Sequence, residues 1–169
     1  MRPFAFIVAG LLLGAIQSVF LRWAGGGTVP LQLLVPCIAW LALEAENVEG
    51  VTAAAGIGYV MDLFGGTPAG LFTFMGVVLY LGARAAGIGV DLRGRLGFAV
   101  LTGAGCLAIS FGAMLIQRWA GLPEAAPGAS LIPRAIVEAL LTSVVSPLVW
   151  LGLTRLEGLL GREEPGLVP

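Results

Sequence analysis

Long apolar runs alternate with short polar or glycine- and proline-rich segments along the whole chain. A helix that crosses a hydrocarbon core of about 30 Å needs about 20 apolar residues. The charged residues, glycines and prolines divide the chain into runs of roughly that length, and each run predicts one helix. The six predicted helices cover residues 3–21, 29–43, 51–64, 68–86, 96–117 and 131–156.

Proline and small residues add detail to this division. Pro36 and Pro147 lie inside predicted helices, where a missing N–H predicts a kink. The run 51–64 is about 14 residues, or about 21 Å at 1.5 Å per residue, which is short for a full span. Because most of its side chains are small, we expect this narrow helix in the middle of a bundle. The acidic segment 44–50 before it is expected to be a loop.

The composition changes the picture from a globular chain to a membrane protein. Hydrophobic residues make up 58% of the chain and charged residues 11%, against about 25% charged residues in ordinary soluble domains. So few charges exclude a soluble enzyme, a disordered chain and a nucleic-acid-binding protein, which needs a basic surface. The sequence therefore predicts an all-α integral membrane protein in the lipid bilayer. One six-helix domain is expected over 1–156, with a short polar tail over 157–169.

The distribution of arginine predicts the orientation. All nine basic residues are arginines, and cytoplasmic loops carry an excess of basic residues. If both termini are cytoplasmic, six arginines lie inside and three lie outside. The inner set is Arg2, Arg84, Arg93, Arg95, Arg155 and Arg162, and the outer set is Arg22, Arg118 and Arg134.

The residue types needed for most metal and catalytic chemistry are missing from the sequence. There is no histidine, and Cys37 and Cys106 stand singly inside apolar runs. Zinc and haem sites depend on histidine or cysteine ligands. No Ser-His-Asp set and no Walker A segment exist, so we expect no catalytic residue, no metal and no cofactor.

Asp62 is the clearest candidate for a functional residue. An ionisable side chain inside a membrane segment indicates function by default. Gly65 and Gly66 are expected to end the third helix, and Thr67 and Pro68 to begin the fourth as N-cap and first residue. The first N–H groups of that helix, near Gly70, lack helical partners, and Asp62 could accept them and lock the hairpin. Direct contact with a ligand, a proton or a partner is the alternative.

Other polar or small residues have two interpretations each. Gln17 hydrogen-bonds either a neighbouring helix or a ligand, and Gly10 with Gly14 allows close packing of either an internal or a partner helix. Arg134 and Glu138 lie on one helix face, as an ion pair or as a polar patch for a partner. The carboxylates of the 44–50 segment form either a solvated face or a docking site for a basic partner; they are Glu44, Glu46 and Glu49.

One stretch, together with weaker features elsewhere, resembles a known family. Its specific part runs from Glu49 to Arg84 and contains Asp-Leu-Phe-Gly-Gly-x-Pro-x-Gly-Leu at residues 62–71. The pattern is similar to that of the rod-shape-determining MreD proteins of bacterial cell-wall elongation. The signature turn matches at Asp62, Gly65, Gly66, Pro68 and Gly70. Weaker agreement comes from Gln17-Ser18, Pro30, Leu79 to Arg84, Leu140-Leu141-Thr142 and Pro147.

The resemblance implies a non-enzymatic scaffold in the bacterial inner membrane. Its expected partner is MreC, a protein with one membrane helix, and further contacts are expected with MreB, RodA and the transpeptidase of RodA. The family is similar in fold to the substrate-binding components of ECF transporters. The alternative function is therefore small-molecule capture, with Asp62, Gln17 and Glu138 lining a pocket.

Overall fold

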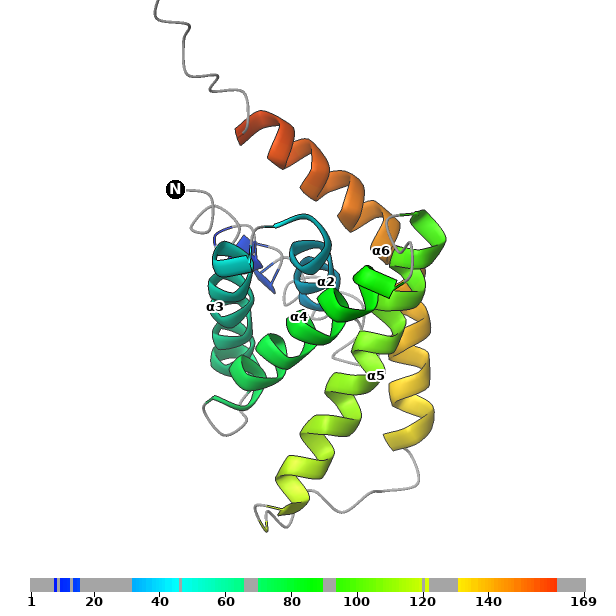
Figure 1. The fold of residues 1–169 in the computed structure, drawn as a ribbon. Coiled ribbons are helices and arrows are strands. Elements are labelled where there is room, and N and C mark those ends of the chain that lie inside the picture. Colours follow the sequence, from blue (N-terminus) through cyan, green and yellow to red (C-terminus); the bar gives the residue numbers. More distant parts are fainter. Residues whose placement is uncertain are drawn as a thin grey trace, which may run out of the picture.

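The computed structural model describes residues 8, 10–12, 14–15, 32–45, 47–65, 70–89, 94–119, 121 and 131–160. Every regular element in these residues is a helix (Figure 1). Residues 8, 10–12 and 14–15 are helical as well. The bounded helices are α2 (Leu34–Glu44), α3 (Asn47–Gly65), α4 (Leu71–Gly89), α5 (Arg95–Trp119) and α6 (Leu131–Leu160).

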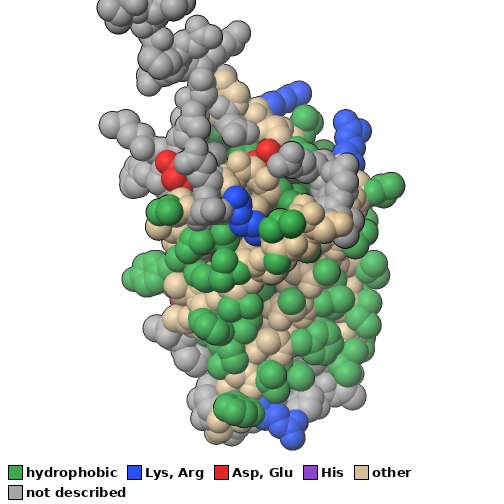
Figure 2. Space-filling view, viewed as in Figure 1, with side chains coloured by type: hydrophobic (Ala, Val, Ile, Leu, Met, Phe, Trp, Pro, Cys, Tyr) green, Lys and Arg blue, Asp and Glu red, His purple; other side chains and the backbone are tan. Residues whose placement is uncertain are grey.

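Three of these helices are long and apolar enough to cross a membrane. They are α4, α5 and the segment Ile132–Leu156 of α6. Large apolar side chains on all three point outward, which a helix tolerates when its surroundings are lipid. Figure 2 shows such side chains across the middle of the molecule, with arginines near its upper and lower ends. The exposed set includes Phe74, Leu81, Val100, Leu115, Leu140, Val144 and Leu148.

Several helix boundaries differ from the prediction, and two of them change an expected loop or tail into helix. α3 begins at Asn47, so Glu49 lies in its first helical turn, and Glu44 is the last residue of α2. The expected acidic loop over 44–50 is therefore mostly helical, because acidic residues are favourable in a first turn. α6 continues to Leu160, four residues into the expected polar tail. Residues 161–169 lie outside the described part.

α2, and not α3, occupies the centre of the described bundle. It contacts α3, α4, α5 and α6, and its residues from Leu34 to Ala42 are all buried (Figure 1). α3 contacts α2 and α4, while Tyr59 and Leu63 on it are more than half exposed. The prediction of a central α3 was wrong. Its small residues instead allow the close approach of one neighbouring helix, α4. At Gly58, the backbone of α4 approaches so closely that no side chain fits.

The two prolines act differently from one another. α2 begins at Leu34, so Pro36 lies in its first turn, where a missing N–H breaks no helical bond, and no kink is needed there. Pro147 is inside α6, which changes direction along its length in Figure 1. Pro147 leaves the Ser143 carbonyl without its helical donor, and the Ser146 hydroxyl donates to that carbonyl at 2.8 Å. The Ser143 hydroxyl donates to the Ala99 carbonyl of α5 at 2.9 Å, which ties the bend to the neighbouring helix.

The contact at Gly58 predicts that Gly58→Ala destabilises the protein. A Cβ atom there would lie 2.5 Å from the Phe72 carbonyl oxygen and 2.7 Å from Thr73 Cα, and backbone atoms cannot yield as a flexible side chain can. We expect a loss of about 1–3 kcal/mol, the usual cost of overpacking. Gly152→Ala on α6 is the control, because nothing lies within 4 Å of its added Cβ. Thermal unfolding in mild detergent compares the two, and equal melting temperatures would contradict the close contact.

Candidate functional site

The Asp62 carboxylate in the last turn of α3 binds the beginning of α4. Its Oδ2 accepts the backbone N–H of Gly70 at 3.1 Å, the N–H of Thr73 at 3.0 Å and the Thr73 hydroxyl at 2.6 Å. Its Oδ1 accepts the Phe72 N–H at 2.8 Å. The side chain is 8% exposed, so these bonds replace water that the carboxylate would otherwise bind.

This arrangement confirms the hairpin lock expected from the sequence. The first N–H groups of a helix lack helical acceptors. At the start of α4, three such N–H groups donate to the Asp62 carboxylate. The Gly70 carbonyl accepts the Phe74 N–H at 3.0 Å, which makes Gly70 the N-cap. Its φ of 95° lies in the left-handed region, where glycine is favoured. The prediction of an N-cap at Thr67 was therefore wrong by three residues.

Of the other residues expected to form this turn, the structure describes only Gly65. Gly65 is the last residue of α3, as expected. Gly66, Thr67 and Pro68 lie outside the described residues, and so does Gln17.

Arg84 of α4 binds the carboxyl-terminal end of α2. Its Nη1 donates to the Ala45 carbonyl at 2.9 Å and, more weakly, to the Ala42 carbonyl and the Tyr80 hydroxyl, both at 3.3 Å. The last carbonyls of a helix lack helical donors, and a cation is favourable near them. From the sequence, Arg84 was expected only as one of the cytoplasmic arginines and as part of the family resemblance. Its position four residues after Tyr80, inside an apolar run, was a signal that could have suggested a helical role.

The beginning of α2 is held by α6. The Gln32 backbone N–H donates to Thr142 Oγ1 at 3.3 Å, and the Gln32 side chain is hydrogen-bonded to the Glu138 carboxyl group. Arg134 is exposed and lies within electrostatic range of Glu138. The sequence did not indicate Gln32, and it indicated Thr142 only as part of the family resemblance. Both ends of α2 are thus bound by polar side chains of other helices.

The glycines near the amino terminus pack inside the molecule. Gly10 and Gly14 are both buried. A Cβ atom on Gly10 would lie 2.9 Å from Ile57 Cγ1 of α3. In the structure, therefore, the face that carries Gly10 is occupied by α3.

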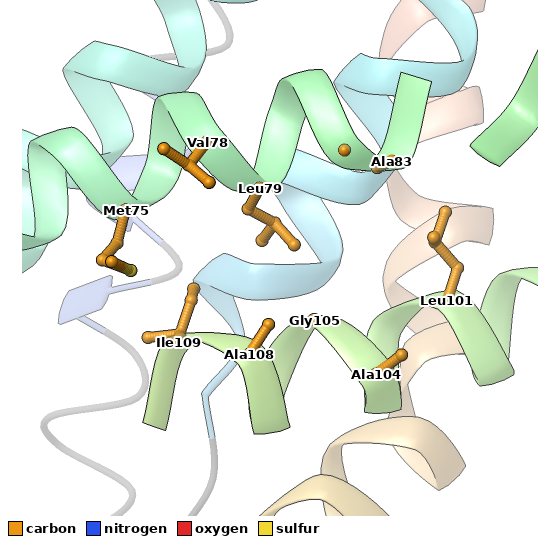
Figure 3. A pocket seen from close by; sticks show the side chains of 10 residues that line it. Met75, Val78, Leu79, Ala83, Leu101, Ala104, Gly105, Ala108 and Ile109 are labelled. Carbon is orange, nitrogen blue, oxygen red and sulfur yellow. The ribbon is translucent and has the colours of Figure 1, made fainter. Parts of the chain in front are cut away.

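A groove with a volume of about 390 Å³ lies between α4 and α5. Residues of α5 form one side of it, and residues of α4 form the other (Figure 3). Ala104 and Ala108, both exposed, belong to this lining. Every lining residue is apolar or glycine, so the groove offers no charged side chain to a ligand. The lining consists of Met75, Val78, Leu79, Gly82, Ala83, Leu101, Ala104, Gly105, Ala108 and Ile109.

Comparisons with known proteins give no match: no family model, no curated protein and no solved structure matches the chain. The resemblance to the MreD family rests on residues of the chain itself.

Substitution of Asp62 is expected to lower stability and abundance. Asp62→Ala leaves the start of α4 without its acceptor, at a cost of about 0.5–2 kcal/mol by analogy with lost helix caps. Asp62→Asn keeps one acceptor oxygen, and we expect a smaller loss. Leu63→Ala is the matched control, because Leu63 is the neighbouring residue and is 63% exposed. If Asp62→Ala melts in detergent at the same temperature as Leu63→Ala, the hairpin lock contributes nothing.

Arg84→Met is expected to loosen α2 while preserving the apolar stem of the side chain. It removes the donor to the Ala42 and Ala45 carbonyls, and hydrogen bonds to charged groups contribute about 1.5–3 kcal/mol. Arg95→Met, at the exposed start of α5, removes the same charge from a site that caps no other helix. The melting temperature should fall for Arg84→Met alone, and a similar fall in both variants would point to charge rather than capping.

Proposed function

We propose that this protein is a non-enzymatic membrane scaffold subunit of bacterial cell-wall elongation. The observation that carries the proposal is the Asp62 lock, which lies in the segment that resembles the MreD signature. In that segment the ionisable side chain and Gly70 both serve the turn between α3 and α4. Polar groups used in this way hold helices in place, which is what a scaffold requires.

The same proposal assigns a location and partners. The protein would lie in the bacterial inner membrane as a multi-pass protein with both termini in the cytoplasm. Three helices of sufficient length and apolar character support a membrane location. MreC would be the direct partner, through its single membrane helix. MreB, RodA and the transpeptidase of RodA would be further partners in the same assembly.

A small-molecule-binding subunit of an ECF-type transporter is the second candidate. The α4–α5 groove favours it, because its volume of about 390 Å³ falls within the range of about 300–1,000 Å³ typical of ligand pockets. Its apolar lining would select an apolar molecule. Such a subunit would also need a partner that hydrolyses ATP.

Affinity purification separates the two candidates. A tagged copy is purified from its native membranes in mild detergent, and mass spectrometry identifies both the proteins and the small molecules recovered. The scaffold function predicts stoichiometric recovery of a single-span protein together with wall-synthesis enzymes. Recovery of an ATPase pair with a bound small molecule, and of no single-span protein, would overturn it.

An Ala108→Phe variant sharpens the same experiment. Ala108 is exposed and lines the groove, so phenylalanine would fill the groove without entering the core. If the groove holds a small molecule, its recovery falls in the variant. Recovery of the single-span protein and the wall-synthesis enzymes should persist in the variant if these partners bind elsewhere on the protein.

A further inference from the structure

Four polar residues form a cluster where the beginning of α2 meets α5 and α6. Glu138 is hydrogen-bonded to the side chain of Gln32, and the Gln32 backbone N–H donates to Thr142 Oγ1. Thr142 is hydrogen-bonded to the Cys106 thiol, and Cys106 lies within electrostatic reach of Glu138. Thr142 and Cys106 are completely buried. Because Glu138 lies in the candidate span of α6, this cluster would be a polar site within a membrane.

One buried atom of this cluster, an oxygen of Gln32, lacks a hydrogen-bond partner. Gln32 Oε1 is buried and accepts no hydrogen bond from the part of the chain that the structure describes. An amide oxygen can only accept, and a buried acceptor without a donor costs about 1–3 kcal/mol. The amide N–H of Gln32 is the donor toward Glu138, because a carboxylate can only accept. A charged Glu138 therefore has no proton to offer to the neighbouring amide oxygen.

We propose that Glu138 is a proton-binding site whose carboxyl group holds a proton and shares it with Gln32 Oε1. A proton from the solvent forms an O–H bond on the carboxylate, and the resulting neutral acid donates to the amide oxygen. The amide N–H still donates to the other oxygen of the acid. The acid and the amide then satisfy one another, and no net charge is buried in the span.

Burial favours the neutral form of Glu138, whereas the hydrogen bond from Gln32 and the charge of Arg134 favour its ionised form. Arg134, one turn earlier on α6, attracts a negative charge, but it is exposed, where solvent and salt weaken the attraction. Gln32, just before α2, contributes an amide and Cys106 of α5 contributes a thiol, and neither carries charge at neutral pH. Asp62 is the opposite case, because four donors and no orphan acceptor surround it and favour its charged form.

Infrared spectroscopy of the full chain in lipid nanodiscs tests the proposal. Exposed carboxyl groups are ionised at about pH 7, so a protonated acid is identified by its own carbonyl stretch, which shifts in D2O. We expect this band in the wild type and its loss in Glu138→Gln, which preserves the shape of the neutral acid. Glu44→Gln is the matched control, because Glu44 is exposed at the end of α2, and it should retain the band. Gln32→Leu should shift the band by removing the acceptor.

A titration of the wild type keeps the test independent of any variant's folding. As the pH is raised above about 7, Glu138 must in the end give up its proton, so both the acid band and the melting temperature should fall. Glu138→Gln should show neither change. Folded wild type without an acid band at about pH 7, or a band that survives in folded Glu138→Gln, would overturn the proposal.

Discussion

The structure depends on the burial of α2, an 11-residue helix enclosed by the rest of the chain. At about 1.5 Å per residue it is about 16 Å long, roughly half the thickness of a hydrocarbon core. In a bilayer, a helix of this length cannot reach water at both ends, so the end groups that lie away from water need partners in protein. Arg84 supplies donors at one end, and Thr142 with Glu138 supplies polar groups at the other. These bonds explain why α4 and α6 carry polar side chains inside apolar runs.

The turn between α3 and α4 also needs partners for the end groups of a helix, and here the partner comes from the preceding helix. There, Asp62 satisfies the N–H groups of the next helix in the chain. In each case a side chain from one helix completes the hydrogen bonds of another. An apolar bundle gains little from hydrophobic burial when lipid surrounds it, so packing and such hydrogen bonds determine its arrangement. The polar residues of the described spans are therefore best understood as connections between helices.

The sequence could predict a contact between two helices only where the two residues lie close together along the chain. Asp62 and Gly70 are eight residues apart, and the pattern of one turn was enough to predict their contact. Arg84 with Ala42 and Gln32 with Thr142 are 42 and 110 residues apart, and no local pattern links them. The run lengths predicted α4 and α5 within a few residues. The central place of α2 was hidden, because an entirely apolar run has no polar face to distinguish lipid from protein contact.

Hydrogen exchange of the α2 amides tests the central claim most directly. If binding of both ends holds α2 at the centre, its amides are among the slowest to exchange in the wild type. Removal of the Arg84 side chain should then speed exchange first at the carboxyl-terminal end of α2, around Ala42 and Ala45. Exchange in α2 as fast as in the exposed start of α6, or unchanged without Arg84, would contradict the account.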